Sequence, residues 1–414
     1  WYKFFTYLFL PFAPFYLYFR KLKKKEDPKR YKEKLSKISL SRGEGFLIWF
    51  HAASVGESMS ILPLIESYVK EKKIDKILLT SITLSSGKIL KKRFSQNAKV
   101  IHQFLPLDIS FWNKKFLEHW RPNLSVFIDS EIWPNLISQI NKKKIPLLLL
   151  NARITKKSFL KWKFVINFAK KIFEKFDLCI ASGTESENYL KILGAKNIRK
   201  IGNLKFSQSK LELKNKSNPR IKKFLINKKI MFSAISTHAG EELLCGKVHS
   251  NLKKKYKNII SIIIPRHVHR AHEIKEELNS NGLKVHLHSS NRPMNKDTDI
   301  YLVDTFGETK AFLRLSKIAF MGKSIHAFGG QNPLEAARLG NRIIHGPNIE
   351  NFVEVYDFLK KHGISSKINS YNDLKNLVVK FERKKNYSQQ IIKKLTYTGN
   401  QILINNEKEI NKYF

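Results

Sequence analysis

The sequence has few cysteines and few acidic residues, and each shortage narrows the class of protein. The two cysteines among its 414 residues, Cys179 and Cys245, lie far apart inside apparent core segments. They make no disulfide framework and lack metal-site spacing, so a reducing compartment fits best. Asp and Glu number 34 against 77 Lys and Arg, a formal net charge of +43. Such a chain attracts polyanions: nucleic acid, anionic lipid or a phosphorylated substrate.

Several familiar binding motifs are also missing. No zinc-finger or RNA-recognition motif accompanies the charge, and Lys is spread along the whole chain, so we predict no nucleic-acid partner. No G-x-G-x-x-G opens either half, which argues against a dinucleotide dehydrogenase. Asp297–Asp299 resembles a metal-binding D-x-D motif, but it precedes a predicted strand and is interpreted as a solvated turn. We therefore predict neither a metal nor a cofactor.

The first 19 residues carry one charge, Lys3, and are dominated by aromatic side chains. They are at the short end for a spanning helix, and Pro11 and Pro14 interrupt them. The basic cluster that follows favours the cytoplasmic side and anionic head groups, and it lies on the wrong side for a cleaved signal peptide. We predict a membrane anchor over residues 1–25, spanning or monotopic, at the cytoplasmic face of the cell inner membrane. The alternative is a buried first helix.

Apolar runs alternate with stretches of helical period in two series, which predicts βαβ units and parallel sheets. The first series lies within residues 26–206 and the second within 220–395. A polar segment rich in Lys, Asn and Ser, residues 207–219, has the composition of a linker. Residues 396–414 are expected to form a helical tail. The fold class is therefore α/β, with two facing Rossmann-like domains and a ligand cleft between them.

Residues Gly45–Ser58, "GFLIWFHAASVGES", place a short turn between a predicted strand and a predicted helix. Open α/β sheets bind ligands at the carboxyl ends of their strands. Glu57 in this turn is therefore a candidate base for a substrate hydroxyl. The competing interpretation is a capping box, in which Ser54 and Glu57 satisfy backbone N–H groups at the start of the helix.

Further polar residues follow other strands of the first half. Asp129 and Glu131 come just after a predicted strand, where Glu131 is either a second site carboxylate or an acid at a helix N-terminus. Arg153 follows the next strand and either holds an anion or pairs with a neighbouring acid. Lys205 lies near the expected boundary between the two domains.

The second half offers cations and a glycine-rich loop. Arg266 and His267 follow a predicted strand and suit a phosphate, whereas a lone H-x-H gives weak support for a metal. The stretch 329–337, "GGQNPLEAA", predicts Asn332 as the N-cap of a helix, with free N–H groups that would face a phosphate. Glu335 would then accept from a ribose hydroxyl or act as a capping glutamate. This stretch predicts a nucleotide-sugar site.

Together these loops resemble the 3-deoxy-D-manno-octulosonic acid (Kdo) transferases, which attach Kdo from CMP-Kdo to a lipid A precursor. The resemblance runs to about residue 395 and rests on eight motifs in the same order. They are "ASVGE" at 53–57, "SEIWPNL" at 130–136, "NARIT" at 151–155, "GNLKF" at 202–206, "STHAGEE" at 236–242, "PRH" at 265–267, "DTFGE" at 304–308 and "GGQNPLEAA" at 329–337. The resemblance implies a two-domain GT-B fold, inverting chemistry without a metal, and a site at the inner face of the cytoplasmic membrane.

The resemblance also implies roles for individual residues. Glu57 would be the base that deprotonates the acceptor hydroxyl, and Glu131 and Lys205 would support the transition state. CMP-Kdo would contact nine residues of the second half: Pro265, Arg266, Phe306, Gly307, Glu308, Asn332, Pro333, Leu334 and Glu335. The implied partners are CMP-Kdo, a lipid A precursor and anionic lipid of the inner membrane.

The chain departs from the family pattern at three positions of the donor half. Gln331 stands where His is usual, Lys323 where Gly is usual, and Ala239 where an acid is expected. These departures bear on contacts to CMP rather than on the reaction. Two other functions fit the residues: a GT-B glycosyltransferase with another donor or acceptor, and a non-catalytic basic protein that binds polyanions at the membrane.

Overall fold

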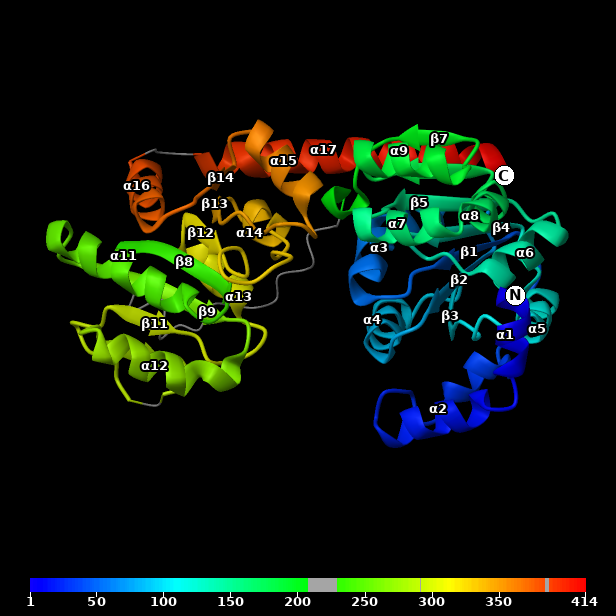
Figure 1. The fold of residues 1–414 in the computed structure, drawn as a ribbon, viewed down its shortest axis with the longest axis horizontal. Helices are drawn as coiled ribbons and strands as arrows, with labels where there is room; N and C mark the ends of the chain where they lie inside the picture. The colour runs from blue at the N-terminus through cyan, green and yellow to red at the C-terminus, as the bar shows by residue number, and fades with distance from the viewer. Residues whose placement is uncertain (208–228, 291, 384–386) are drawn as a thin grey trace. The chain divides into compact units, whose positions relative to one another are not determined.

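A computed structural model describes residues 1–207, 229–290, 292–383 and 387–414 (Figure 1). The chain forms two compact units. The first comprises Trp1–Ser209 together with Thr398–Phe414, and the second comprises Lys210–Tyr397. Residues 208–219 of the predicted linker lie outside the described residues.

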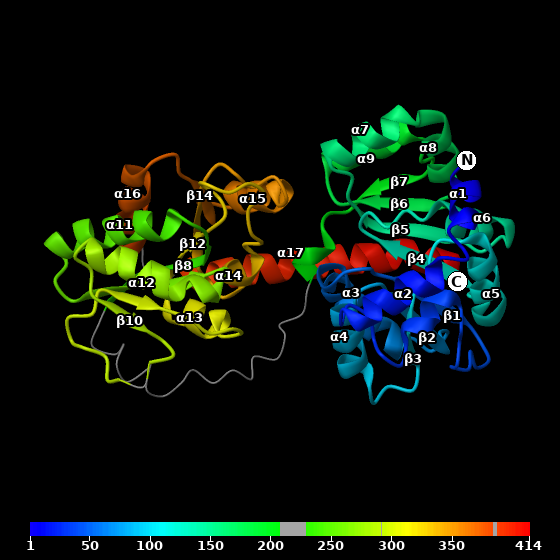
Figure 2. The ribbon, with the colours of Figure 1, turned by 60° about the horizontal axis from the view of Figure 1, so that its bottom comes forward.

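The first unit is built on a parallel seven-stranded sheet in the order β3-β2-β1-β4-β5-β6-β7 (Figure 2). Its strands are β1 (Leu47–His51), β2 (Lys76–Ser81), β3 (Val100–Phe104), β4 (Leu124–Ile128), β5 (Leu147–Ala152), β6 (Leu178–Ala181) and β7 (Ile198–Lys200). Apolar runs predicted all of these except β7, a mostly exposed edge strand. The predicted parallel α/β architecture is confirmed for this unit.

Helices cover both faces of this sheet. They are α1 (Tyr2–Leu8), α2 (Ala13–Leu22), η1 (Tyr31–Leu35), α3 (Val55–Lys70), α4 (Leu84–Phe94), α5 (Ser110–Trp120), α6 (Pro134–Lys142), α7 (Lys156–Phe164), α8 (Ile166–Phe173), α9 (Thr184–Leu193) and η2 (Leu204–Ser207). In β1, Trp49 packs on Phe116 of α5, with 5.0 Å between ring centroids. The next residue, Phe50, points to the opposite face and stacks on Tyr68 of α3. Burial on both faces explains why β1 is a continuous apolar run.

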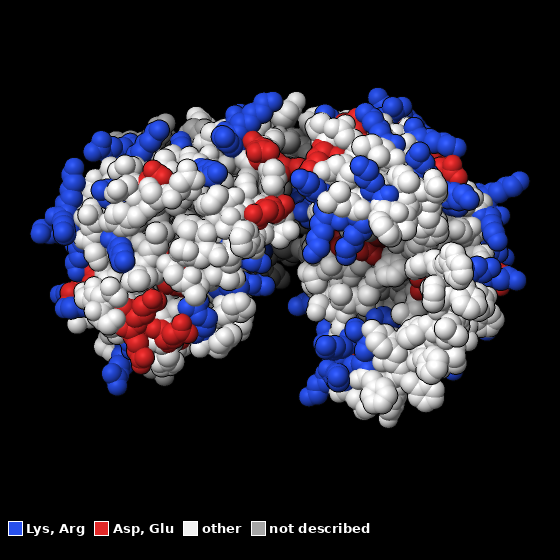
Figure 3. Space-filling view, viewed as in Figure 1, with Lys and Arg blue, Asp and Glu red and all other residues white. Residues whose placement is uncertain are grey.

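The two N-terminal helices pack against the rest of the first unit, but most of their aromatic side chains are exposed. Ala13 and Leu17 of α2 are buried, and the Tyr2 hydroxyl donates to Asp108 Oδ2 at 2.9 Å. Figure 3 shows that uncharged residues cover much of α2, with Lys and Arg gathered along one side. In the described part of the chain, every helix is too short or too polar to traverse a bilayer.

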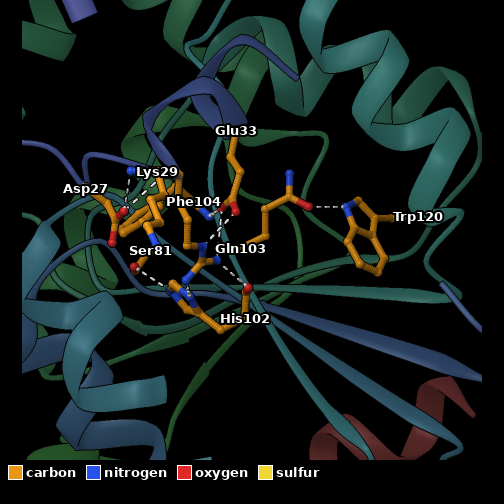
Figure 4. A network of polar contacts seen from close by, with 9 residues as sticks. Asp27, Lys29, Glu33, Ser81, His102, Gln103, Phe104 and Trp120 are labelled. Carbon is orange, nitrogen blue, oxygen red and sulfur yellow. Dashed lines mark hydrogen bonds and ion pairs between the residues drawn. The ribbon is translucent and has the colours of Figure 1, made fainter. Parts of the chain in front are cut away.

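A polar network fastens η1 to the sheet (Figure 4). The Glu33 carboxylate accepts from Arg30 Nε at 2.7 Å and from the backbone N–H of Phe104 at 2.8 Å. Arg30 also donates to the carbonyl of His102 at 2.7 Å. These contacts join the segment after the N-terminal helices to β3, so that segment is part of the first unit's fold.

The second unit also contains a parallel seven-stranded sheet, in the order β10-β11-β9-β8-β12-β13-β14. Its strands are β8 (Lys229–Thr237), β9 (Ile259–Pro265), β10 (Val285–Leu287), β11 (Ile300–Leu302), β12 (Ile318–Met321), β13 (Arg342–His345) and β14 (Ser365–Lys367). Its helices are α11 (Glu241–Lys255), η3 (Val268–Arg270), α12 (Ala271–Ser280), α13 (Thr309–Leu315), α14 (Leu334–Arg338), α15 (Val353–Lys361) and α16 (Tyr371–Glu382). The second predicted α/β domain is confirmed; β14 is polar and was not predicted.

The chain ends with α17 (Tyr387–Ile410) and the short η4 (Asn411–Tyr413). From Thr398 onward this segment belongs to the first unit. There the Tyr68 hydroxyl of α3 donates to Asn411 Oδ1 at 2.9 Å, and the terminal Phe414 ring packs on Phe46. The expected helical tail is thus an integral part of the first unit's packing.

Candidate functional site

Glu57 forms the predicted capping box at the start of α3. The backbone N–H of Glu57 donates to Ser54 Oγ at 3.4 Å. The Glu57 carboxylate accepts from the N–H of Ala53 at 2.7 Å through Oε2 and from the Ser54 hydroxyl at 2.7 Å through Oε1. These bonds fix the carboxylate at the carboxyl end of β1. Capping and a chemical role are therefore compatible, because the cap holds the carboxylate in place.

Asp129 and Glu131 lie close enough to Glu57 to influence its protonation. Burial raises the pKa of Glu57 above its ordinary value, and the charges of Glu131 and Asp129 raise that pKa further, while the hydrogen bond from Ser54 lowers it. Asp129 follows β4 with φ of 64°. The sheet order places β4 beside β1, so both loops open at the same edge. The predicted meeting of acids from two loops is what the structure shows.

Lys205 and Arg153 bring positive charge to this group of acids. Lys205 Nζ lies 3.5 Å from Asp129 Oδ2. Burial raises the pKa of Asp129, and the charges of Lys205 and Arg153 act in the opposite direction. Asn151 at the end of β5 accepts from the backbone N–H of Leu204 at 2.9 Å and so holds η2 in place. The "NARIT" and "GNLKF" loops thus act together to position Lys205.

Glu131 is held by aromatic and imidazole donors. The indole Nε1 of Trp133 donates to Glu131 Oε2 at 2.8 Å, and His51 Nε2 lies 3.3 Å from the same oxygen. Because Pro134 begins α6, the Glu131 carboxylate is outside that helix. Glu131 is therefore not an acid in the first turn of a helix, which was the alternative interpretation.

In the second unit, Pro265 and Arg266 lie where β9 ends. Pro265 is the last residue of β9 and is paired with Thr237 of β8. The backbone N–H of Arg266 donates to the Thr237 carbonyl at 3.1 Å. The His238 and His267 rings meet edge to face at 5.7 Å beside them. Cationic and polar groups of two neighbouring strands thus gather at one edge of this sheet.

The "DTFGE" loop follows β11 at the same edge. Glu308 accepts from the Thr305 hydroxyl, and its Oε2 lies 2.7 Å from His288 Nε2. Phe306 is 78% exposed, and Gly307 adopts φ of 90° with open space around its Cα. The loop therefore presents an aromatic ring and accessible backbone, while Glu308 is engaged within the protein.

The glycine-rich loop differs from the prediction at its helix. Pro333, not Asn332, is the N-cap, and the five-residue α14 begins at Leu334. Asn332 Oδ1 instead accepts from the backbone N–H of Leu334 at 3.1 Å, a short-range bond typical of Asn in turns. This shifts Glu335 to the second helical position, where it pairs with Lys310 at 3.2 Å. The predicted N-cap was wrong by one residue.

Glu241 organises the loop that follows β12, and sequence reasoning assigned it no role. Its fully buried carboxylate accepts from the backbone N–H groups of four residues at 2.8–3.0 Å: His238, Lys323, Ser324 and Ile325. Lys323 adopts φ of 57°, in the region that favours glycine. This agrees with the expected Gly at that position and shows that the backbone conformation tolerates Lys.

The described residues contain no group of three or more His, Cys, Asp or Glu arranged to hold a metal ion. The D-x-D sequence is not the fully solvated turn that was expected. Asp299 is 3% exposed, and its carboxylate contacts His249 and Lys253. Asp297 is partly exposed and forms an ion pair with Lys284.

Two other residues that sequence reasoning missed, His51 and Thr80, are polar side chains near the ends of buried strands. His51 ends β1 and Thr80 lies in β2, and both are almost inaccessible to solvent. In the sequence, the pattern that could have identified them is a polar residue at the end of an apolar run. Their contacts depend on strand pairing between segments far apart in the chain, which a single sequence does not reveal.

Comparison with known proteins agrees with the motifs. The family described as 3-Deoxy-D-manno-octulosonic-acid transferase (kdotransferase) matches residues 28–208. A 3-deoxy-D-manno-octulosonic acid transferase of Rickettsia bellii is 35% identical over 91% of this chain and 89% of that protein. One from Haemophilus influenzae is 28% identical over 87% of this chain and 85% of that protein.

Among solved structures, a UDP-GlcNAc 2-epimerase from Neisseria meningitidis bound to UDP-GlcNAc matches 89% of this chain and all of that one. Its TM-score is 0.58 at 15% identity, a likeness that shows the fold alone. The relatives in sequence go further, because they cover nearly the whole chain at substantial identity. The chain belongs to the 3-deoxy-D-manno-octulosonic acid transferase family.

Proposed function

We propose that this protein transfers Kdo from CMP-Kdo to a lipid A precursor in lipopolysaccharide biosynthesis. The observation that carries the proposal is the group of acids at one edge of the first sheet, in which a half-buried Glu57 is held by its capping box beside Glu131 and the Lys205–Asp129 pair. The sequence relatives named above support the choice of donor sugar.

In the proposed reaction, Glu57 takes the proton of the acceptor hydroxyl as that oxygen attacks the anomeric carbon of Kdo. The bond between that carbon and the phosphate oxygen breaks, and CMP leaves with its electron pair. A base with a raised pKa suits this step, because proton transfer is efficient when the pKa is near the working pH. Attack opposite the leaving group inverts the anomeric centre.

Glu131 and Lys205 would stabilise the charge that develops during transfer. Lys205 supplies a cation that suits the Kdo carboxylate or the departing phosphate. Asp129 Oδ1 is buried and has no hydrogen-bond partner among the described residues.

CMP would bind the second unit. The proposed contacts lie beyond the ends of β9, β11 and β12, where Arg266 offers a cation, Phe306 an exposed ring, and the loop before α14 the partly exposed Asn332. A guanidinium such as that of Arg266 binds phosphate oxygens well. Asn332 and Glu335 would then orient the nucleotide.

We also propose that the protein lies at the cytoplasmic face of the inner membrane and enters it as a monotopic protein. Exposed aromatic side chains cover both N-terminal helices, among them Phe4 at 61%, Phe12 at 62%, Phe15 at 68% and Phe19 at 62%. The basic residues Arg20, Lys21 and Lys23–Lys25 adjoin them in the sequence, and Lys and Arg gather beside these uncharged residues in Figure 3. Aromatic rings at the head-group level beside basic residues are typical of interfacial helices.

The deciding assay supplies CMP-Kdo and a lipid A precursor to the full chain on anionic vesicles, with EDTA present, and follows release of CMP. Mass spectrometry of the lipid should show added Kdo. Release of CMP only with another acceptor would favour a different GT-B glycosyltransferase. A folded sample that bound vesicles and released no CMP with any nucleotide sugar would favour a non-catalytic polyanion-binding protein.

A further inference from the structure

His51 holds the carboxylate of Glu131 and lies beneath it in the protein. His51 Nε2 is 3.3 Å from Glu131 Oε2, the oxygen that also accepts from Trp133. Among the described residues, Glu131 Oε1 has no hydrogen-bond donor. The His51 side chain is inaccessible to solvent, whereas 14% of the Glu131 side chain is exposed. Both donors therefore fix one oxygen and leave the other for a substrate.

A chain of hydrogen bonds sets which nitrogen of His51 carries the proton. The Trp49 indole only donates, and it donates to Thr80 Oγ1 at 2.9 Å. The Thr80 hydroxyl has one proton of its own. His51 Nδ1 lies 2.9 Å from Thr80 Oγ1, whereas the alternative acceptor, the Phe50 carbonyl, lies 3.4 Å away.

The shorter contact favours donation from Thr80 to His51 Nδ1. The imidazole then carries its proton on Nε2, the nitrogen that faces Glu131. An ionised carboxylate accepts hydrogen bonds and donates none, so this tautomer satisfies both partners. The three links, Trp49 to Thr80 to His51 to Glu131, all run in one direction.

The sheet fixes this arrangement. His51 is the last residue of β1 and is paired in register with Thr80 of β2 and Phe127 of β4. The imidazole meets the Phe127 ring at 5.3 Å and the Trp133 ring at 6.5 Å between centroids. Two paired strands and two aromatic rings leave the imidazole little freedom, which is the condition for a precise supporting contact.

We propose that His51, as the Nε2–H tautomer fixed by Thr80, is the positioning residue that orients Glu131 for Kdo transfer. This inference rests on the proposed function, since it assumes that Glu131 takes part in the reaction. His51 itself touches no substrate, so its effect should appear in kcat rather than in KM.

Substitution of His51 separates positioning from folding. His51→Ala should lower kcat about 10- to 100-fold, the usual effect of losing a hydrogen bond to a charged group, with KM values little changed. His51→Gln keeps an N–H donor of similar reach and should recover most of the loss. The exposed His272 on α12 provides the control, since His272→Ala should leave both constants unchanged. Equal loss in His51→Ala and His51→Gln at unchanged melting temperature would overturn the proposal.

A double-mutant cycle distinguishes this inference from the function on which it rests. If Glu131→Gln keeps wild-type turnover, the role proposed for Glu131 fails. If Glu131→Gln loses turnover, and the double variant with His51→Ala and Glu131→Gln is no slower than Glu131→Gln alone, His51 acts through Glu131 as proposed. If the fold-loss in the double variant equals the product of the two single losses, His51 acts independently of Glu131, and the positioning role is overturned.

The tautomer has a spectroscopic signature that does not depend on activity. In protein labelled with ¹⁵N-histidine, with the His51 signals assigned by comparison with His51→Gln, Nε2 should be protonated and Nδ1 should be an acceptor. Thr80→Val removes the hydroxyl and should shift the ring towards a mixture of tautomers, while Thr80→Ser should preserve the wild-type pattern. An Nδ1–H tautomer in the wild-type protein would contradict the inference.

Discussion

Lys205 and Asp129 form an ion pair between two loops of the first unit, with 3.5 Å between Nζ and Oδ2. Both side chains are mostly buried, at 14% and 10% exposure. Asp129 follows β4, whereas Lys205 lies in η2 after β7. The pair partly neutralises a site rich in carboxylates, which matters for a donor that is itself anionic.

Removal of the charge on Glu57 tests its role as the base. Glu57→Gln should lower kcat at least about 100-fold, because an amide does not accept the proton of the acceptor hydroxyl. The fold should persist, since the Ser54 side chain still accepts from the backbone N–H of residue 57. CMP release gives the rate and thermal unfolding checks the fold. Glu66→Gln, on the same helix, is the control, and undiminished turnover in Glu57→Gln would refute the assignment.

The pH dependence of kcat/KM should reflect the raised pKa of Glu57. The base works only when ionised, so the rate should fall as pH decreases through a pKa above the ordinary value of 4.5. Asp129→Asn removes a negative charge that raises this pKa, so the acidic limb should move to lower pH. An acidic limb that stayed in place or moved upward would contradict the electrostatic coupling.

Lys205 should contribute through its charge. Lys205→Met should lower kcat/KM about 10- to 100-fold, because a cation facing an anionic donor is lost, and Lys205→Arg should restore part of the rate. Lys200→Met removes an exposed lysine that lies 3.8 Å from Glu187 and should change nothing. If Lys205→Met were no slower than Lys200→Met, Lys205 would have no role in the transition state.

Glu241 should matter for both stability and donor binding. Glu241→Ala leaves four backbone N–H groups without their acceptor, and a buried unpaired group costs about 1–3 kcal/mol. We expect a loss of at least ~2 kcal/mol in urea unfolding and a higher KM for CMP-Kdo. The exposed Glu273→Ala serves as the control. Wild-type stability in Glu241→Ala would show that these bonds contribute little.

The N-terminal helices should account for binding to lipid vesicles. Phe15 and Phe19 lie one turn apart on α2 and are both largely exposed. Their joint replacement by Ser should weaken binding to anionic vesicles at least about tenfold, because a buried Phe contributes about 1.5–3 kcal/mol. Tyr397→Ser, which alters an exposed aromatic residue of α17, should bind normally. Equal binding by all three proteins would place the membrane contact elsewhere.

Most strands of the first unit were predictable, because parallel strands buried on two faces are continuous apolar runs. The loops that carry Glu57 and Glu131 were predictable because they directly follow such runs. The edge strands β7 and β14 were not predicted, because their residues are largely exposed and form no continuous apolar run. The N-cap of α14 was predicted at Asn332, one residue before the observed N-cap at Pro333. Asn favours both N-caps and local turns, and propensity alone does not distinguish the two. Membrane association stays a prediction.

The sequence by itself determined the two α/β series, the order of the motifs and the capping box of Glu57, since each depends on residues close together in the chain. Only the tertiary structure decided which carboxylates have partners. Pairing of β1 with β2 and β4 brings Thr80 to His51 and His51 to Glu131, and η2 brings Lys205 to Asp129. These contacts join distant segments through sheet register, and local propensity carries no information about that register.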